Sequence, residues 1–127
     1  MENKNKDFRN LEIWQEAHKL ALEIYNISKL FPKDEIYGLT SQIRRAAVSV
    51  ALNIAEGYGR YHYLEEINFL FNARGSITEV QSCLLLSKDL KYVKAEIIDK
   101  LFDRYSILSK RVNSLIKYKK EKKNEKK

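Results

Sequence analysis

Four long segments of the chain repeat apolar residues every three or four positions, the spacing that places them on one face of an α-helix. In the first segment this face holds Trp14, Ala17, Ala21, Ile24, Ser28 and Phe31. A neighbouring stripe holds Ile13, Leu20 and Ile27. Pro32 ends the segment, because the residue before a proline is disfavoured in the α conformation. The sequence therefore predicts a first helix with a wide apolar surface.

The other three segments cover residues 34–55, 63–90 and 94–118. Asp34 is the expected N-cap of the second, and Gly57 its expected left-handed C-terminal cap. Gly75 lies inside the third, where glycine costs about 1 kcal/mol relative to alanine, so we expect a tight helix crossing there. The predicted inward residues are Leu39, Ile43, Ala46, Ala47, Val50 and Ile54, then Ile67, Leu70, Phe71, Ile77, Val80 and Leu84, then Ile97, Ile98, Leu101, Tyr105, Leu108, Val112 and Leu115.

Alternation of apolar and polar residues with period two, which is typical of strands, is nowhere sustained. The connections are at most about eight residues long, and short connections make sequential helices antiparallel neighbours. The sequence therefore predicts an all-α fold, an up-and-down antiparallel four-helix bundle over residues 9–118. We expect a flexible N-terminus over 1–8 and a disordered lysine-rich tail over 119–127, because lysine, glutamate and asparagine bury no apolar surface.

The net charge of +7 on 127 residues is unevenly distributed along the chain. Residues 117–127 hold seven lysines and two glutamates, so this stretch carries +5 and the rest of the chain only +2. A basic excess favours an anionic partner, and clustered cations bind nucleic acid through salt-sensitive contacts. The single cysteine, the polar N-terminus and the lack of any apolar run of about 18 residues predict a cytoplasmic protein that does not enter a membrane.

The sequence contains no recognisable set of catalytic or metal-binding residues. His18 and His62 lack the Glu-x-x-His spacing of di-iron bundles. We expect His18 to lie beside Trp14 and His62 to lie at the start of the third helix. Cys83 falls in an apolar run, where a thiol behaves as a small buried hydrophobe. The expectation is therefore a protein that is not an enzyme and uses no metal or other cofactor.

One face of the second helix is polar. Its residues are Gln42, Arg45, Ser49, Asn53 and Glu56. The third helix adds Asn72, Arg74 and Glu79. Two interpretations stay open: the two arginines pair with Glu56 and Glu79 inside the bundle or at a subunit contact, or one or both face phosphate. Arg44 cannot share a face with Arg45, so at least one of these two should point outward.

Nine basic residues are candidates for contacts with nucleic acid. They are Arg44, Arg45, Arg60, Arg74, Lys117, Lys119, Lys120, Lys122 and Lys123. Tyr58, Tyr61 and Tyr63 alternate with Arg60 and His62 after the second helix, and exposed aromatic rings beside arginine can stack on unpaired bases. Two alternatives remain: such tyrosines can close the end of the core, and a lysine-rich terminus can be a solvated end.

Four stretches of the sequence stand out as motifs: Leu-Glu-Ile-Trp-Gln-Glu-Ala at 11–17, Phe-Pro-Lys-Asp-Glu-Ile-Tyr-Gly-Leu-Thr-Ser-Gln-Ile-Arg-Arg-Ala-Ala at 31–47, Asn-Ile-Ala-Glu-Gly at 53–57 and Ala-Arg-Gly-Ser-Ile-Thr-Glu at 73–79. Together they resemble a family of bacterial four-helix bundles encoded in intervening sequences of 23S rRNA genes and often labelled ribosomal proteins. The resemblance covers about residues 8–118. The family is related to the accessory variability determinant of diversity-generating retroelements.

The resemblance implies a bundle that assembles as a homopentamer and has no known enzymatic activity. The retroelement relative binds nucleic acid and its reverse transcriptase through a basic assembly surface. A subunit interface would use the wide apolar surface of the first helix, and five chains of +7 would carry +35. We therefore predict an oligomer that binds nucleic acid, RNA in preference to DNA. The alternative is a protein-interaction scaffold, for example for a reverse transcriptase, in which the basic charge is incidental.

Overall fold

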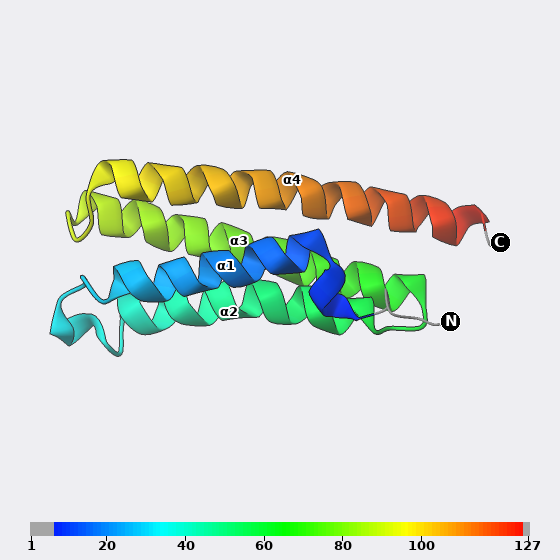
Figure 1. Ribbon diagram of the computed structural model, residues 1–127, viewed down its shortest axis with the longest axis horizontal. Helices are drawn as coiled ribbons and strands as arrows, with labels where there is room; N and C mark the ends of the chain where they lie inside the picture. Colours follow the sequence, from blue (N-terminus) through cyan, green and yellow to red (C-terminus); the bar gives the residue numbers. More distant parts are fainter. Residues whose placement is uncertain (1–6, 126–127) are drawn as a thin grey trace.

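The computed structural model describes residues 7–125, which form four long helices running in alternating directions (Figure 1). The long helices are α1 (Glu12–Ser28), α2 (Leu39–Tyr58), α3 (Tyr63–Asp89) and α4 (Ala95–Glu125), and two short 3₁₀ helices cover Phe8–Asn10 and Lys33–Glu35. No strand occurs in the described range. The predicted all-α, up-and-down four-helix bundle is confirmed.

The core follows the predicted apolar stripes with small shifts. The residues with no exposed surface include Ala17, Leu20, Ile24, Ile43, Val50, Ile77, Val80, Tyr105, Leu108 and Val112. Phe71 and Leu115 are only half-buried, and Ile97 is exposed. Ile116 takes the expected place of Leu115, because a four-residue step from Val112 keeps the stripe facing α3 and α1. The contact between α1 and α4 is the smallest of the four helix contacts.

The start of α2 differs from the prediction, because Glu35 and not Asp34 serves its backbone. The Glu35 carboxylate accepts hydrogen bonds from the N–H of Leu39 (2.9 Å) and from the hydroxyl of Tyr92 (2.8 Å). These two bonds, the backbone one first, lower the pKa of the Glu35 carboxyl. A Cβ on Gly38 would lie 2.7 Å from Glu35 Oε1, so glycine leaves room for this carboxylate.

The roles predicted for two glycines are both wrong. No glycine among residues 7–125 has a positive φ, and Gly57 lies buried within the last turn of α2 rather than in a left-handed cap. A Cβ on Gly57 would come within 2.9 Å of the Cβ of Phe69 in α3. Gly75 is exposed, and no atom lies within 4 Å of the position of its missing Cβ. The close approach between α2 and α3 is therefore at Gly57.

The end of α3 is a Schellman motif formed without glycine. The N–H of Lys91 donates to the carbonyl of Lys88, and the N–H of Tyr92 donates to the carbonyl of Ser87, both at 3.0 Å. Lys91 has a φ of 64°, the left-handed conformation that glycine usually supplies at this position. Backbone hydrogen bonds therefore fix the turn from α3 into α4.

The last helix continues past residue 118, where the sequence predicts the end of the bundle. The residues expected to form a disordered tail are helical as far as Glu125, and residues 126–127 lie outside the described range. Lysine and glutamate are good helix formers. Two lysines also contact α3: Lys119 Nζ lies 3.2 Å from Glu66 Oε1, and Lys120 Nζ lies 5.2 Å from the ring centroid of Phe71.

The segment before α1 is also structured from Asp7 onward, although the sequence predicts flexibility through residue 8. The Asp7 carboxylate accepts a hydrogen bond from the N–H of Arg9 at 2.9 Å and caps the short 3₁₀ helix. The ring of Phe8 packs edge-on against Trp14, with centroids 5.0 Å apart. Residues 1–6 of the predicted flexible N-terminus lie outside the described range.

Candidate nucleic-acid interface

Charged residues are distributed differently at the two ends of the bundle. The neutral end comprises residues 29–38 and 86–103, around the α1–α2 and α3–α4 connections, and carries six cations and six acids. The basic end comprises residues 7–12, 56–74 and 110–123 and carries ten cations and six acids. Seven of those ten cations, against a single acid, lie in residues 110–123 of α4, which extends beyond the α2–α3 connection (Figure 1).

An ion pair between a buried glutamate and a half-buried lysine joins α3 to α4 at the basic end. Glu66 is 8% exposed, and its Oε1 lies 3.2 Å from Lys119 Nζ. The same ammonium group lies 5.7 Å from the ring centroid of Tyr63. Glu66 continues the apolar stripe of α3, and Lys119 continues that of α4, so the two charges meet where the stripes end. This pair ties the extension of α4 to α3.

Two candidate cations from adjacent helices converge on the ring of Phe71. The guanidinium carbon of Arg74 lies 4.8 Å from the ring centroid, and Lys120 Nζ lies 5.2 Å from it. Arg74 also donates a hydrogen bond to Asn113 Oδ1 at 2.8 Å. Neither cation forms an ion pair with an acid in the range 7–125. Lys117, also on α4, is exposed. This arrangement is suited to an anionic group.

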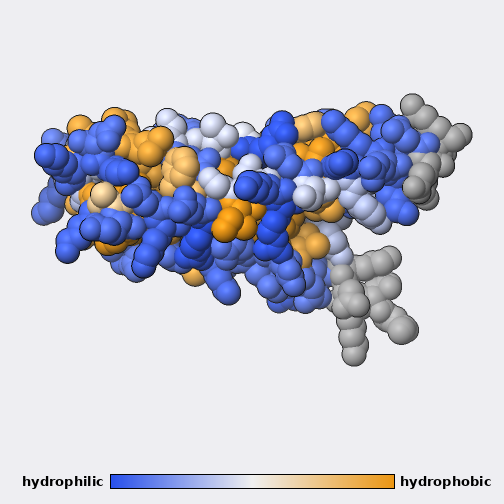
Figure 2. Space-filling model, turned by 90° about the horizontal axis from the view of Figure 1, so that it is seen from above, coloured by the Kyte–Doolittle hydropathy of each residue, from blue (hydrophilic) through white to orange (hydrophobic). Residues whose placement is uncertain are grey.

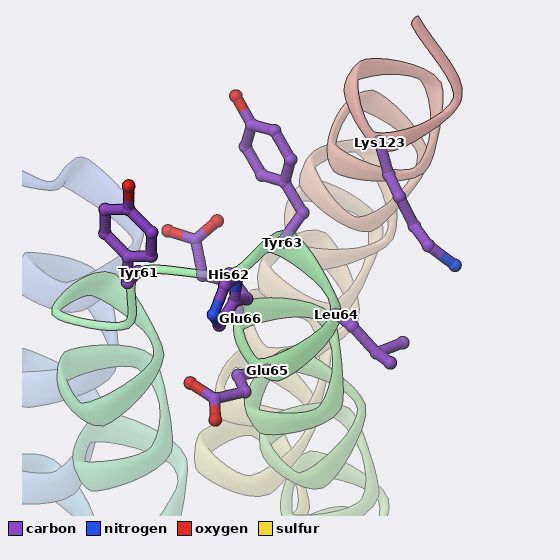
Figure 3. Close-up of a pocket in the computed structure, with 7 residues that line it drawn as sticks. All are labelled: Tyr61, His62, Tyr63, Leu64, Glu65, Glu66 and Lys123. Atoms are coloured by element: carbon purple, nitrogen blue, oxygen red, sulfur yellow. The ribbon is translucent and has the colours of Figure 1, made fainter. Parts of the chain in front are cut away.

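The cations around the α2–α3 connection have more varied surroundings. Arg60 donates a hydrogen bond to Glu56 Oε1 at 2.8 Å, and its guanidinium lies 4.7 Å from the ring centroid of Phe69. Lys122 Nζ lies 5.7 Å from the ring centroid of Tyr118. Lys123 helps to line an open hollow beside the connection (Figure 3). The structure therefore brings Arg60 and the five predicted lysines Lys117, Lys119, Lys120, Lys122 and Lys123 to one end of the molecule.

Two other candidates, Arg44 and Arg45, lie in the first half of α2, away from the basic end. The side chain of Arg44 donates to Ser28 Oγ at 2.7 Å and lies 4.7 Å from the ring centroid of Tyr25, so it ties α2 to α1. Arg45 is exposed beside an open groove that Tyr25 and Leu52 also line. The expectation that at least one of the two arginines points outward is confirmed.

The polar face of α2 forms hydrogen bonds mainly to α3. Gln42 donates to a Glu79 oxygen, and Ser49 Oγ accepts from Ser76 Oγ at 2.9 Å. Within α2, the amide of Asn53 donates to the carbonyl of Ser49 at 2.9 Å. This face therefore stabilises the contact between the two helices.

The internal pairing proposed for the two arginines is not found. Glu56 accepts from Arg60, Glu79 accepts from Gln42, and Arg74 donates to Asn113. Neither Arg45–Glu56 nor Arg74–Glu79 occurs as an ion pair in the part of the chain that is described. A role for these arginines at a subunit contact or against phosphate stays a prediction.

The side chains considered for chemistry lie apart from one another. His18 stacks on Trp14 at 4.8 Å, as predicted, and His62 directly precedes α3. Cys83 is buried, and burial, with the nearby charge of Glu79, raises the pKa of its thiol. Across residues 7–125 no group of three or more His, Cys, Asp or Glu is placed to hold a metal ion. No described helix has both the length and the apolar character needed to cross a membrane.

Several residues of the basic end were not identified from the sequence. Phe69 and Phe71 support cations across helices, and Asn113 positions Arg74. Of these contacts, only the Glu66–Lys119 pair could have been noticed in the sequence, because each of the two charged residues falls on an otherwise apolar stripe of its helix. Viewed from the α4 side, hydrophilic residues cover most of the surface and hydrophobic ones form separate patches (Figure 2). This face is therefore suited to a polar or charged partner.

Comparison with known proteins agrees with the fold and the motifs. The family model of the 23S rRNA-intervening sequence protein matches residues 9–114. A crystal structure of a protein of unknown function from the S23 ribosomal protein family of Bacteroides thetaiotaomicron VPI-5482 is similar, with a TM-score of 0.77 and 23% identity over 83% of this chain and 98% of that one. A search of curated proteins finds no match. The chain belongs to the family of 23S rRNA-intervening sequence proteins.

Proposed function

We propose that this protein binds RNA in the cytoplasm through the basic end of its bundle and catalyses no reaction. The observation that supports this most is the convergence of Arg74 and Lys120 on Phe71 without an acid partner among residues 7–125. Each cation lies over the ring without an acid partner from the described chain, and a phosphate group would supply the missing negative charge. Along α4, Lys117 precedes Lys120, and Lys122 and Lys123 follow it, which extends the cationic surface.

The ordered extension of α4 strengthens the proposal. A disordered tail would lose conformational entropy on binding, whereas lysines on a helix are already fixed in spacing. The Glu66–Lys119 pair holds this helix against α3. Seven cations and one acid in residues 110–123 give a local excess that a polyanion can neutralise with release of its counterions.

We further propose that five copies form a ring through the faces of α1 and α2. Leu22 is 60% exposed and Leu52 57% exposed, and Tyr25 and Leu52 line a groove of about 480 Å³ beside Arg45. A single chain leaves this apolar surface in water, which is typical of a surface that binds a partner. A cyclic ring presents the same end of each subunit on the same side, so five basic ends would act on one RNA.

Binding of structured ribosomal RNA at a series of salt concentrations tests the first proposal. Filter binding should show an affinity that falls linearly with the logarithm of salt concentration. Absence of binding at low salt, or binding indifferent to salt, would contradict it. Light scattering on the same sample gives the oligomer mass, and a Leu22→Glu, Leu52→Glu variant should be smaller than the parent if the α1 and α2 faces form the ring.

A protein-interaction scaffold is the second candidate, and the same apolar face of α1 and α2 favours it. A protein partner such as a nucleic-acid enzyme would cover Leu22 and Leu52 in place of another subunit. Recovery from host extract of a protein that stays bound after nuclease treatment, together with no affinity for RNA, would support this candidate over the first.

A further inference from the structure

The three tyrosines around the α2–α3 connection differ sharply in exposure. Tyr58 is half-buried at the end of α2, and Tyr63 is half-buried with Lys119 Nζ 5.7 Å from its ring centroid. Tyr61 is 92% exposed. Its ring makes an edge-to-face contact with that of the neighbouring His62, with centroids 5.0 Å apart and planes at 83°. Of these three tyrosines, Tyr61 therefore has the most side-chain surface open to solvent.

The hollow beside Tyr61 is large enough for a nucleotide. It measures about 750 Å³ and is lined by Tyr61, His62, Tyr63, Leu64, Glu65, Glu66 and Lys123. Figure 3 shows the rings of Tyr61 and Tyr63 projecting away from the helices, and Lys123 on α4 beyond Tyr63, with its side chain pointing away from both rings. The ion pair with Lys119 neutralises Glu66, whereas Glu65 is exposed and can accept a hydrogen bond from the amino group of a base.

We propose that Tyr61 is a stacking platform for an unpaired base, and hence that the RNA bound at the basic end is single-stranded where it meets the α2–α3 connection. The inference rests on the proposed function. Any base can stack on an exposed aromatic ring, whereas bases inside a duplex are already stacked on one another. The lysines of α4 can bind the phosphates of single-stranded and of duplex RNA, so the preference for single strands comes from the ring of Tyr61.

The neutral end provides a matched control for this proposal. Tyr37 is 95% exposed, as open to solvent as Tyr61, but it follows Asp34 and Glu35, and the six cations of the neutral end are matched by six acids. Both ends therefore have an exposed tyrosine, and only Tyr61, at the basic end, is expected to contribute to RNA binding.

The test compares a short unstructured RNA of mixed sequence with the duplex that it forms with its complement, by fluorescence anisotropy over a range of salt. Tyr61→Ala should lower affinity for the single strand about tenfold, within the range for loss of one base–aromatic stack. The slope of affinity against salt should not change, because no phosphate contact is removed. Tyr61→Phe should bind like the parent, and Tyr37→Ala should bind both RNAs like the parent.

The outcomes distinguish a failure of base stacking on Tyr61 from a failure of RNA binding at the basic end. If the parent binds single strand and duplex and Tyr61→Ala binds the single strand equally well, stacking is overturned while RNA binding at the basic end stands. If the parent binds neither RNA at low salt, the proposed function itself fails. A loss in Tyr61→Ala that is as large for the duplex as for the single strand also overturns the stacking role.

Discussion

The two ends of the bundle use their charged side chains in different ways. At the neutral end they complete the fold: Glu35 accepts hydrogen bonds from Leu39 and Tyr92, and Lys88 pairs with Asp99 at 2.8 Å. At the basic end Lys119 pairs with Glu66, but Arg74 and Lys120 lie over an aromatic ring. Matched charges are explained by the fold alone, whereas Arg74 and Lys120 form no ion pair within residues 7–125, and we propose RNA as their partner.

Removing charge from each end in turn gives the largest expected difference. Changing Lys117, Lys120, Lys122 and Lys123 to Gln should lower RNA affinity on the order of 100-fold near physiological salt, because these lysines can then no longer neutralise phosphates. Changing Lys29, Lys33, Lys91 and Lys94 to Gln removes the same charge from the neutral end. Filter binding should show only a small decrease in the RNA affinity of this neutral-end variant, because its lower net charge weakens the long-range attraction to RNA. Equal decreases for the two variants would show that only net charge matters.

Breaking the ion pair of the basic end is expected to affect stability next most strongly. Lys119→Met should lower the free energy of unfolding by about 2 kcal/mol, because it leaves the nearly buried Glu66 carboxylate without its partner. Adding Glu66→Gln to that variant should restore most of the stability. Urea unfolding followed by circular dichroism measures both. Lys117→Met is the control at an exposed position, and a destabilisation as large as that of Lys119→Met would contradict this account.

The glycines of the two ends should respond differently to alanine. Gly57→Ala is expected to lower the free energy of unfolding by about 1 kcal/mol, because a clash worth about 2 kcal/mol with Phe69 exceeds the gain in helix propensity. Gly38→Ala should cost less, since its Cβ meets the movable carboxylate of Glu35. Gly75→Ala, in open space, should stabilise by about 1 kcal/mol. Thermal and urea unfolding of the three variants would contradict the assignment if Gly57→Ala were stabilising.

A pH dependence of stability is expected at the neutral end, with the smallest effect. The hydrogen bonds from Leu39 and Tyr92 lower the pKa of the folded Glu35 carboxyl below its ordinary value of 4.5. The unfolded chain therefore binds this proton first as pH falls, so the stabilisation is present above pH 4.5 and disappears at lower pH. The stability difference between the parent and Glu35→Gln should shrink from about pH 7 to about pH 3. A difference that stays constant over this range would contradict the role of Glu35.

The sequence predicted the helices and the core well because both depend on local spacing. Apolar residues at steps of three and four identified the buried stripes, and Pro32 correctly marked the end of α1. The caps were predicted less well, because they depend on side chains that reach across turns. Glu35 serves α2 only because Tyr92, far along the chain, supports its carboxylate.

The candidate site could be predicted only in part. Its lysines were evident from composition, but the helical conformation that holds them in place was not. Past residue 118 the helix contacts Glu66 and Phe71 in α3, which lie far from it in the sequence. The roles of Gly57 and Gly75 were reversed, because sequence spacing does not show how closely two helices approach. The ring of Phe71 became a meeting point for two cations only when α3 and α4 were placed side by side.

The central claim is that RNA binds at the basic end, and the salt dependence of affinity tests it most directly. The affinity of the parent for single-stranded RNA should fall linearly with the logarithm of salt concentration. The variant that lacks Lys117, Lys120, Lys122 and Lys123 should show a slope shallower by about 0.7 for each phosphate that the protein no longer neutralises, whereas the neutral-end variant keeps the slope of the parent. Identical slopes for all three proteins, or no binding by the parent at low salt, would contradict the claim.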